Sequence, residues 1–233
     1  MKVLGFDTAT PVTSVALSED GRIIAELSIT GDRTQMERLM PMIDAALKDA
    51  GVKVRDIDGI AVGTGPGLFT ALRIGVATAN ALSQALRVPI AGVSSLDALA
   101  KGCAGSGETI AAVIDAKRGE VFASLYISDA GLNSLVWAAG VFEPETLARR
   151  LAVVGGEVIA VGNGVIAYQN IFKEYLGDNL SVAAPELMFP RAAAVIELGE
   201  PALREAPKGL PGQVRPVYVR QPDADKNIKK MKQ

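Results

Sequence analysis

Apolar residues form short unbroken runs in some parts of the chain and recur at helical spacing in others. A short apolar run bounded by turn residues has the length and composition of a buried strand. Such runs lie at residues 3–7, 60–62, 88–93, 110–114 and 159–161. The segments 14–18 and 121–126 each follow a turn after one of these runs, which is the order of a hairpin. The pattern therefore predicts a protein of the α/β class.

The order of these elements occurs twice. The sequence IAVGTG at residues 60–65 recurs as IAVGNG at residues 159–164, and each copy ends in a Gly-x-Gly turn before a helical stretch. An apolar strand that ends in aspartate precedes each copy, at residues 3–7 and 110–115. Short apolar words match by chance, but a shared order of elements is typical of an internal duplication.

Helical spacing completes each copy. Apolar residues recur with this spacing at residues 34–50, 68–86, 144–151, 168–176 and 191–203, and Ser94 or Ser95 caps a further short helix. Hairpins followed by alternating strands and helices give a mixed sheet flanked by helices. Two such lobes resemble the actin-like (ASKHA) architecture of Hsp70 and sugar kinases. The predicted parts are lobes at residues 1–104 and 105–205, with a segment at 206–233 that packs back on the first lobe and ends in a frayed basic tail.

The amino-acid composition excludes several kinds of catalytic and metal-binding site. The chain of 233 residues contains no histidine, which removes the commonest general base and every metal site built on imidazole. Cys103 is the only cysteine, so an internal disulfide is excluded. The net charge is −2, whereas a protein that binds RNA alone usually has a basic excess. We expect no bound metal and a cytoplasmic location with no signal peptide or membrane span. If RNA is involved, we expect another subunit to carry most of the contact.

The glycine-rich segment 63–75 is the most distinctive part of the chain. It lacks the lysine of a Walker A loop, and Leu68 stands where a dinucleotide fingerprint needs its third glycine. Two interpretations remain open, namely a strand-to-helix turn and an anion or partner surface at the start of a helix. The segment 162–167 matches Gly-x-Gly-x-x-Ala, but its twin in the first copy breaks that pattern, so nicotinamide binding is disfavoured.

Two acidic corners are candidates for a nucleotide cleft. Asp7 and Thr8 lie where actin-like ATPases place a phosphate-binding turn, although Ala9 replaces the glycine expected there. Asp115, with Lys117 and Arg118, occupies the equivalent corner of the second copy. The alternative is that each corner is an ordinary hairpin turn that satisfies its own polar groups.

Two helices of the first copy are candidates for a partner surface. Small residues at four-residue spacing would let another helix approach closely, and methionine adapts to more than one opposing surface. The predicted interface residues are Met36, Leu39, Met40, Ile43, Ala71, Leu72, Gly75 and Ala79. Internal packing of the same residues remains the alternative.

Several segments together resemble the TsaB family, also called YeaZ. They are VLGFDTAT at 3–10, ERLMPMI at 37–43, GPGLFTALRIG at 65–75, DAKRGEV at 115–121 and RPVYVR at 215–220. The family glycine motif corresponds to Gly65, Pro66, Gly67, Phe69, Thr70 and Arg73. The likeness is densest over residues 1–121. Leu68 and Ala71 depart from the small residues usual around the Phe-Thr pair, and Thr34 stands where a histidine is often seen.

The resemblance implies a non-catalytic partner or scaffold subunit for tRNA N6-threonylcarbamoyladenosine modification. Such a subunit binds the TsaD transferase together with the TsaE ATPase, contacts tRNA through the complex, and forms a homodimer when isolated. It implies no tightly bound cofactor, with ATP and Mg²⁺ acting at the level of the complex and at most weak nucleotide binding here. A stand-alone actin-like ATPase or small-molecule kinase that uses Asp7 and Asp115 remains the alternative.

Overall fold

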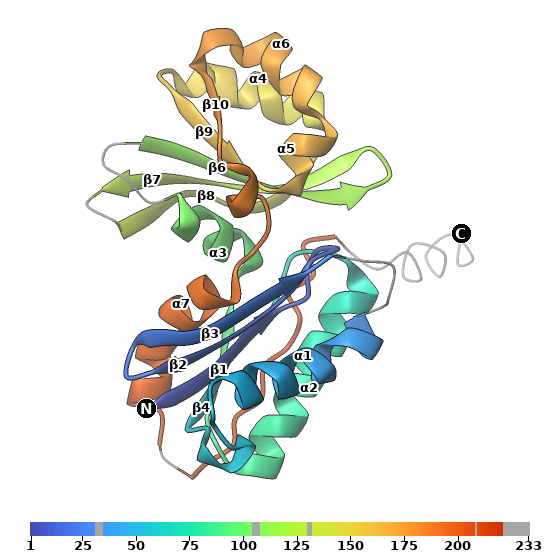
Figure 1. Cartoon of the computed structure of the whole chain (residues 1–233). Helices are drawn as coiled ribbons and strands as arrows, with labels where there is room; N and C mark the ends of the chain where they lie inside the picture. Colours follow the sequence, from blue (N-terminus) through green and yellow to red (C-terminus); the bar gives the residue numbers. More distant parts are fainter. Residues whose placement is uncertain (31–34, 104–107, 130–131, 208, 221–233) are drawn as a thin grey trace, which may run out of the picture.

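A computed structural model describes residues 1–30, 35–103, 108–129, 132–207 and 209–220. The chain forms two lobes that lie end to end, each built on one five-stranded sheet (Figure 1). The strands of the first lobe are β1 (Lys2–Asp7), β2 (Thr13–Glu19), β3 (Arg22–Ile29), β4 (Gly59–Gly63) and β5 (Ile90–Val93). Those of the second are β6 (Glu108–Lys117), β7 (Glu120–Asp129), β8 (Leu132–Phe142), β9 (Val158–Val161) and β10 (Leu180–Val182).

Helices cover both sheets. They are α1 (Gln35–Asp49), α2 (Phe69–Leu86), α3 (Ser95–Gly102), α4 (Pro144–Val154), α5 (Asn163–Ala167), α6 (Gln169–Leu176) and α7 (Ala192–Glu205), with short 3₁₀ turns at Val54–Asp56, Gly177–Asn179 and Pro185–Leu187. The side chain of Ser94 accepts a hydrogen bond from the backbone N–H of Asp97 and caps α3, as the sequence predicted. No helix in the described ranges is both long and apolar enough to cross a bilayer.

The two sheets have the same strand order. The first runs β3-β2-β1-β4-β5, and the second, read from its other edge, runs β8-β7-β6-β9-β10. In each sheet the first strand pairs antiparallel with the hairpin strand that follows it and parallel with the fourth strand. Equal order and equal direction confirm the predicted duplication and the actin-like fold class.

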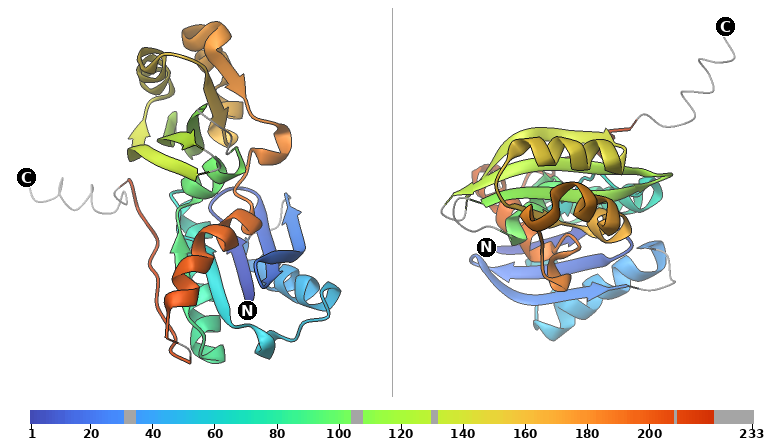
Figure 2. Two further views of the ribbon diagram at one scale, coloured as in Figure 1. Left: turned by 90° about the vertical axis from the view of Figure 1, so that its left-hand side faces the viewer. Right: turned by 90° about the horizontal axis from the view of Figure 1, so that it is seen from above.

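The first sheet is buried on both faces because side chains alternate across it. Leu4 and Phe6 of β1 point toward the apolar cluster shared with α1 and α2, whereas Val3 points toward the cluster shared with α7. Figure 2 shows α1 and α7 on opposite faces of this sheet. The second sheet is likewise enclosed, by α4 and α6 on one face and by α3 on the other.

The helices α3 and α7 each pack against the lobe opposite to the one that contains the strand before them in the chain. The sequence placed residues 191–203 in the second lobe, but α7 packs against β1, β4 and β5 of the first. Conversely, α3 was placed in the first lobe, but it packs against β6, β7 and β8 of the second and against α7. The predicted boundaries are wrong for these helices, because each finds its complementary apolar face on the other sheet. The boundary at residues 104 and 105 itself falls outside the described ranges.

The segment after α7 returns along the first lobe. Residues 209–220 run beside α2 toward the second lobe, as the red trace in Figure 2 shows. Gly212 N–H donates to Ser83 Oγ at 3.2 Å, and Val217 N–H donates to the Thr64 carbonyl oxygen at 2.8 Å. The basic tail predicted from Lys226, Lys229, Lys230 and Lys232 lies outside the described residues.

Candidate functional site

Asp7 ends β1 and is buried, with only 1% of its surface exposed. One carboxylate oxygen, Oδ1, accepts a hydrogen bond from Ala9 N–H at 2.7 Å. The other, Oδ2, accepts one from Ser95 Oγ at 2.6 Å. Burial raises the pKa of Asp7 to about 6, and the two hydrogen bonds offset part of that rise. The carboxylate is therefore held by the chain itself and does not face solvent.

The turn after Asp7 is packed against the glycine loop and α2. Thr8 is fully buried, and its hydroxyl donates to the Ala71 carbonyl oxygen at 2.8 Å. A Cβ placed on Gly75 would lie 2.4 Å from Thr8 Oγ1, and one on Gly67 would lie 2.2 Å from the Ala9 carbonyl oxygen. Both glycines are thus required by close approach of the backbone. The corner proposed for a nucleotide in the first lobe is filled by its own residues, which favours the ordinary hairpin turn, and a nucleotide role for Asp7 and Thr8 stays a prediction.

The equivalent corner of the second lobe is nearer the surface. Asp115 Oδ1 accepts from Lys117 N–H at 2.8 Å, and Oδ2 pairs with Lys117 Nζ at 2.7 Å. Asn163 Oδ1, at the start of α5, accepts from Asp115 N–H at 3.2 Å. Lys117 and Arg118 are exposed at the tip of the β6–β7 hairpin. The described contacts give Asp7 and Asp115 no common partner, which favours the self-satisfied turn at both corners.

Most residues predicted at a partner interface lie inside the first lobe. Leu39 and Ile43 of α1, together with Ala71, Leu72 and Ala79 of α2, are buried. Gly75 is also buried, against Thr8. This part of the prediction is wrong, because α2 turns its small-residue stripe toward its own sheet. Met40 is 49% exposed and remains available to a partner, whereas the side chain of Met36 lies outside the described residues.

The outward face of α2 carries a different set of side chains. Arg73 places its guanidinium 3.8 Å from the centre of the Phe69 ring and donates from Nε to the Tyr218 hydroxyl at 3.0 Å. The rings of Phe69 and Tyr218 lie 5.1 Å apart, and each residue is 40% exposed. Thr70 and Ala77 are exposed beside them. Two members of the predicted glycine motif, Phe69 and Arg73, therefore belong to an exposed aromatic and cationic cluster.

Sequence reasoning missed two partners of these sites. Ser95 had been considered only as a helix cap, yet its side chain holds the Asp7 carboxylate. Tyr218 had been noted only within the closing segment, yet it completes the cluster with Arg73. Each of these contacts joins residues more than 80 positions apart. No local pattern connects residues at such a separation.

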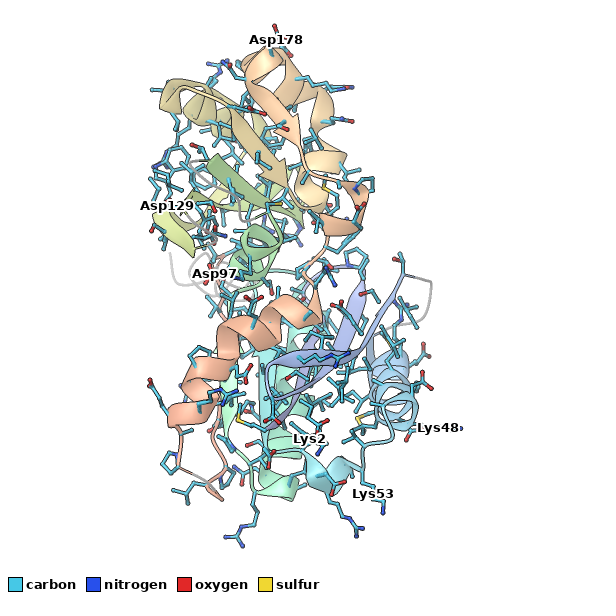
Figure 3. The ribbon with its side chains drawn as sticks, turned by 60° about the vertical axis from the view of Figure 1, so that its left-hand side comes forward. Lys2, Lys48, Lys53, Asp97, Asp129 and Asp178 are labelled. Atoms are coloured by element: carbon cyan, nitrogen blue, oxygen red, sulfur yellow. The ribbon has the colours of Figure 1, made fainter. Side chains whose placement is uncertain are left out.

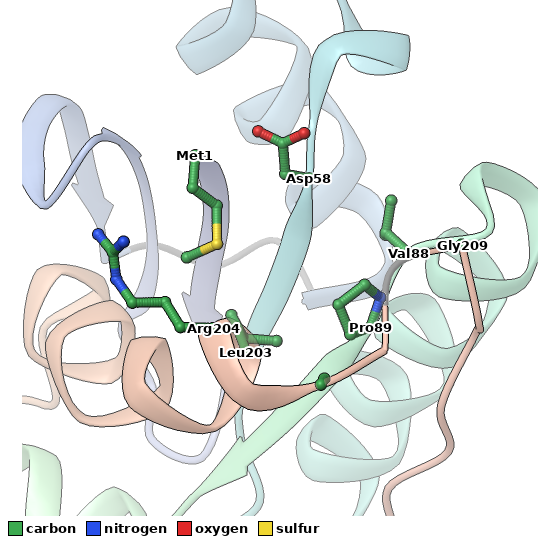
Figure 4. A pocket seen from close by; sticks show the side chains of 8 residues that line it. Met1, Asp58, Val88, Pro89, Leu203, Arg204 and Gly209 are labelled. Atoms are coloured by element: carbon green, nitrogen blue, oxygen red, sulfur yellow. The ribbon is translucent and has the colours of Figure 1, made fainter.

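A pocket of about 380 Å³ lies at another place in the first lobe, near the amino ends of β1, β4 and β5 (Figure 4). Its lining residues are Met1, Asp58, Val88, Pro89, Leu203, Arg204, Ala206 and Gly209. None of the predicted site residues is among them. The described residues contain no group of three or more His, Cys, Asp or Glu side chains that could hold a metal ion. The predicted absence of a metal stays a prediction.

Comparison with known proteins places the chain in a family. A family model described as TsaD, tRNA N6-adenosine threonylcarbamoyltransferase, matches residues 23–228. The tRNA threonylcarbamoyladenosine biosynthesis protein TsaB of Escherichia coli (strain K12) is 32% identical over 226 residues, which cover 94% of this chain and 95% of that protein. The chain belongs to the TsaB family. The resemblance inferred from the sequence motifs is confirmed.

Solved structures agree with this assignment. A Pseudomonas aeruginosa protein described as similar to peptidase YeaZ superposes with a TM-score of 0.78 at 30% identity, covering 94% of this chain and 99% of that one. The ROK hexokinase of Thermus thermophilus superposes with a TM-score of 0.50 at 13% identity, covering 88% and 100% of the two chains. The second likeness concerns the fold alone. The TsaB family thus shares its two-lobed architecture with a sugar kinase.

Proposed function

We propose that this chain is the non-catalytic partner subunit in the biosynthesis of threonylcarbamoyladenosine on tRNA. The observation that carries the proposal is the filled corner around Asp7 and Thr8, in a protein of a fold whose enzymes bind nucleotides there. The absence of histidine and the full-length similarity to TsaB proteins agree with it. The subunit supports a TsaD-type transferase, together with a TsaE-type ATPase, in the cytoplasm. ATP, Mg²⁺ and tRNA act at the level of that complex.

The proposed partner surface is the outward face of α1 and α2. Both helices cover the same face of the first sheet, and their outer residues are exposed. The exposed residues of the two helices include Glu37, Met40, Pro41, Asp44, Phe69, Thr70, Arg73, Ala77, Ala81 and Ala85. The three alanines follow one another at four-residue spacing, which lets a second helix pack closely. The same face serves a second copy of the chain when no transferase is present, so the two assemblies are mutually exclusive.

Reconstitution of tRNA modification tests the function. We expect the transferase and the ATPase to form threonylcarbamoyladenosine only when this chain is added, and we expect the isolated chain neither to modify tRNA nor to hydrolyse ATP at a useful rate. Modification of tRNA that is equally fast without the chain would contradict the proposal. ATP hydrolysis by the pure chain that is abolished by Asp7→Asn would favour the kinase-like alternative.

A substitution on the outer face tests the surface. Ala77→Arg adds a long charged side chain to an exposed helical position, so we expect an unchanged circular dichroism spectrum. Capture of a TsaD-type transferase should fall at least about tenfold, since a buried unpaired charge is costly at an interface. The matched control is Ala152→Arg, at an exposed position of α4 in the second lobe. Capture that is equal in both variants would show that the surface lies elsewhere.

A further inference from the structure

The segment 209–220, here called the strap, is fastened to the first lobe at several points. The side chain of Asn80 on α2 binds the backbone of Val214 twice, donating to its carbonyl oxygen and accepting from its N–H, both at 3.0 Å. Val214 also packs against the apolar cluster beneath α1 and α2. Farther along, the hydroxyl of Tyr218 accepts from Arg73 at 3.0 Å. The strap is therefore an integral part of the first lobe as far as Tyr218.

The next two residues are fastened to the second lobe. Val219 packs against the apolar cluster that includes Phe122, between α3 and the second sheet. Arg220 Nη1 donates to the Ala116 carbonyl oxygen at 3.1 Å, and Arg220 Nη2 forms an ion pair with the carboxylate of Glu120. The side chains of Arg220 and Glu120 are 21% and 38% exposed, so the pair is partly shielded from water. Both acceptors belong to the β6–β7 hairpin.

The short distance between the two sets of contacts limits movement of the lobes. Only Val219 separates Tyr218 from Arg220, and two residues reach about 7 Å when fully extended. A larger separation of the lobes at this point requires either the Tyr218 contacts or the Arg220 contacts to break. The chain also passes between the lobes at α3 and α7, so the strap adds a further link to these crossings.

We propose that the strap is a clasp that sets the angle between the two lobes. It closes when Arg220 binds Glu120 and the Ala116 carbonyl oxygen, and it opens when those contacts are lost. Tyr218 belongs both to the strap and to the exposed cluster on α2, so a molecule that binds Phe69, Arg73 and Tyr218 more tightly in one state of the clasp than in the other changes its equilibrium. By linkage, closure of the clasp changes the affinity for that molecule by the same factor. The clasp is independent of the proposed function, whereas its coupling to a transferase rests on it.

Distances between spin labels test the clasp in the isolated chain. Lys53 and Asp178 are exposed at opposite ends of the molecule (Figure 3). In a Cys103→Ser background, nitroxides on Lys53→Cys and Asp178→Cys report the separation of the lobes. We expect Arg220→Ala to broaden the distance distribution and shift its mean. Amide exchange in the β6–β7 hairpin should become about five to ten times faster, since two hydrogen-bonded contacts are lost.

The control is Arg149→Ala, which removes an exposed ion pair with Glu145 of α4 and a hydrogen bond to Tyr175 of α6, both within the second lobe. We expect this variant to keep the wild-type distance distribution. A folded Arg220→Ala variant with wild-type distances and wild-type exchange would overturn the clasp. Should Arg220→Ala fail to fold, Glu120→Ala decides instead, because it removes the carboxylate that accepts from Arg220. A broadened distribution then supports the clasp, and an unchanged one overturns it.

The coupling has its own measurement. We expect a TsaD-type transferase to shift the label distance in the wild-type background but to cause a smaller shift in Arg220→Ala, where the clasp is already open. An equal shift in both backgrounds would overturn the coupling. No binding of the transferase, with the effect of Arg220→Ala on the distances intact, would contradict the proposed function and leave the clasp standing.

Discussion

The two lobes share one strand order but differ in the helix that follows the fourth strand. In the first lobe, α2 runs unbroken for 18 residues. In the second, α5 has 5 residues and α6 has 8, with Tyr168 between them. The broken pair turns back onto its own lobe, where Phe172 and Leu176 pack against α4. The unbroken helix instead leaves a straight outer face, which is the form that another helix can pack against.

The two lobes also differ in the surroundings of the aspartate that lies at the end of the first strand of each lobe. Asp7 is buried and held by Ser95, whereas Asp115 keeps its carboxylate beside the exposed Lys117. The two aspartates occupy equivalent positions of the duplicated fold, so the fold does not determine their environment. Ser95 of α3 and the backbone of α2 at Ala71 and Gly75 fill the first corner, and the second keeps a charged hairpin tip. In a duplicated chain, the equivalence of two residues therefore predicts where they lie in the fold, but it does not predict which groups surround them.

The largest expected effect comes from placing the same side chain on opposite faces of α2. Gly75→Arg forces a long side chain into the space occupied by Thr8, and it should lower the free energy of unfolding by more than about 4 kcal/mol. Ala77→Arg, on the exposed face, should change it by less than about 0.5 kcal/mol. Thermal melts followed by circular dichroism measure both values. A well-folded Gly75→Arg variant would contradict the burial of this stripe.

The second-largest expected effect concerns how the free energy of unfolding depends on pH through Asp7 and Asp115. The pKa of Asp7 in the folded chain, about 6, lies above the ordinary value of about 3.9 for an unfolded chain. The folded state keeps its proton to a higher pH, so the free energy of unfolding decreases as the pH rises from about 4 to about 6 and stays lower above that range. Asp7→Asn, which retains the acceptor for Ala9 N–H and can donate to Ser95, should raise stability at pH 7.5 by roughly 1–3 kcal/mol.

Denaturant titrations across this pH range measure the effect. The slope between pH 4 and pH 6 should be flatter in Asp7→Asn than in the wild type. Asp115→Asn is the matched control at the equivalent corner, because it removes the ion pair with the exposed Lys117 and keeps an acceptor for Lys117 N–H, and it should change stability less than Asp7→Asn does. An unchanged slope in Asp7→Asn would contradict the raised pKa of the buried carboxyl group.

The smallest effect compares two tyrosine hydroxyls in the second lobe. Tyr126 donates to Asp97 of α3 at 2.6 Å, near the junction of the lobes where Figure 3 labels Asp97. Burial raises the pKa of Tyr126, and the neighbouring carboxylate raises it further. Tyr126→Phe should cost about 1–2 kcal/mol, because the removed hydrogen bond is shielded and leads to a charged acceptor. Tyr175→Phe, on the exposed surface, should cost less than about 0.5 kcal/mol. Equal costs in urea titrations would contradict the difference in shielding.

The strands at the centre of each sheet were predictable because they are buried on both faces. Residues 3–7, 60–62, 110–114 and 159–161 form continuous apolar runs, and they lie in β1, β4, β6 and β9. The strands β3, β8 and β10 were not predicted individually. They lie at the edges of their sheets, where exposed residues interrupt the apolar pattern.

The candidate site was predictable only in part. The glycine motif identified the turn between β4 and α2, because close backbone approach demands glycine there. The direction of the small-residue stripe was not predictable, since α2 carries small residues on its inner and outer faces alike. Ala71 and Ala79 turn toward the sheet, whereas Ala77 and Ala81 turn toward solvent. The spacing of residues in the sequence gives the angle between their positions around the helix axis. It does not determine which side of the helix faces the sheet.

The sequence by itself determined the duplication, the central strands, the turns and the family, because these depend on local backbone preference and on the period of apolar residues. Only the tertiary structure decided which sheet α3 and α7 cover, which side chain holds Asp7, and how the strap joins the lobes. Each of those outcomes brings together residues far apart in the chain. Their pairing depends on which apolar faces and polar groups fit one another once both sheets have formed.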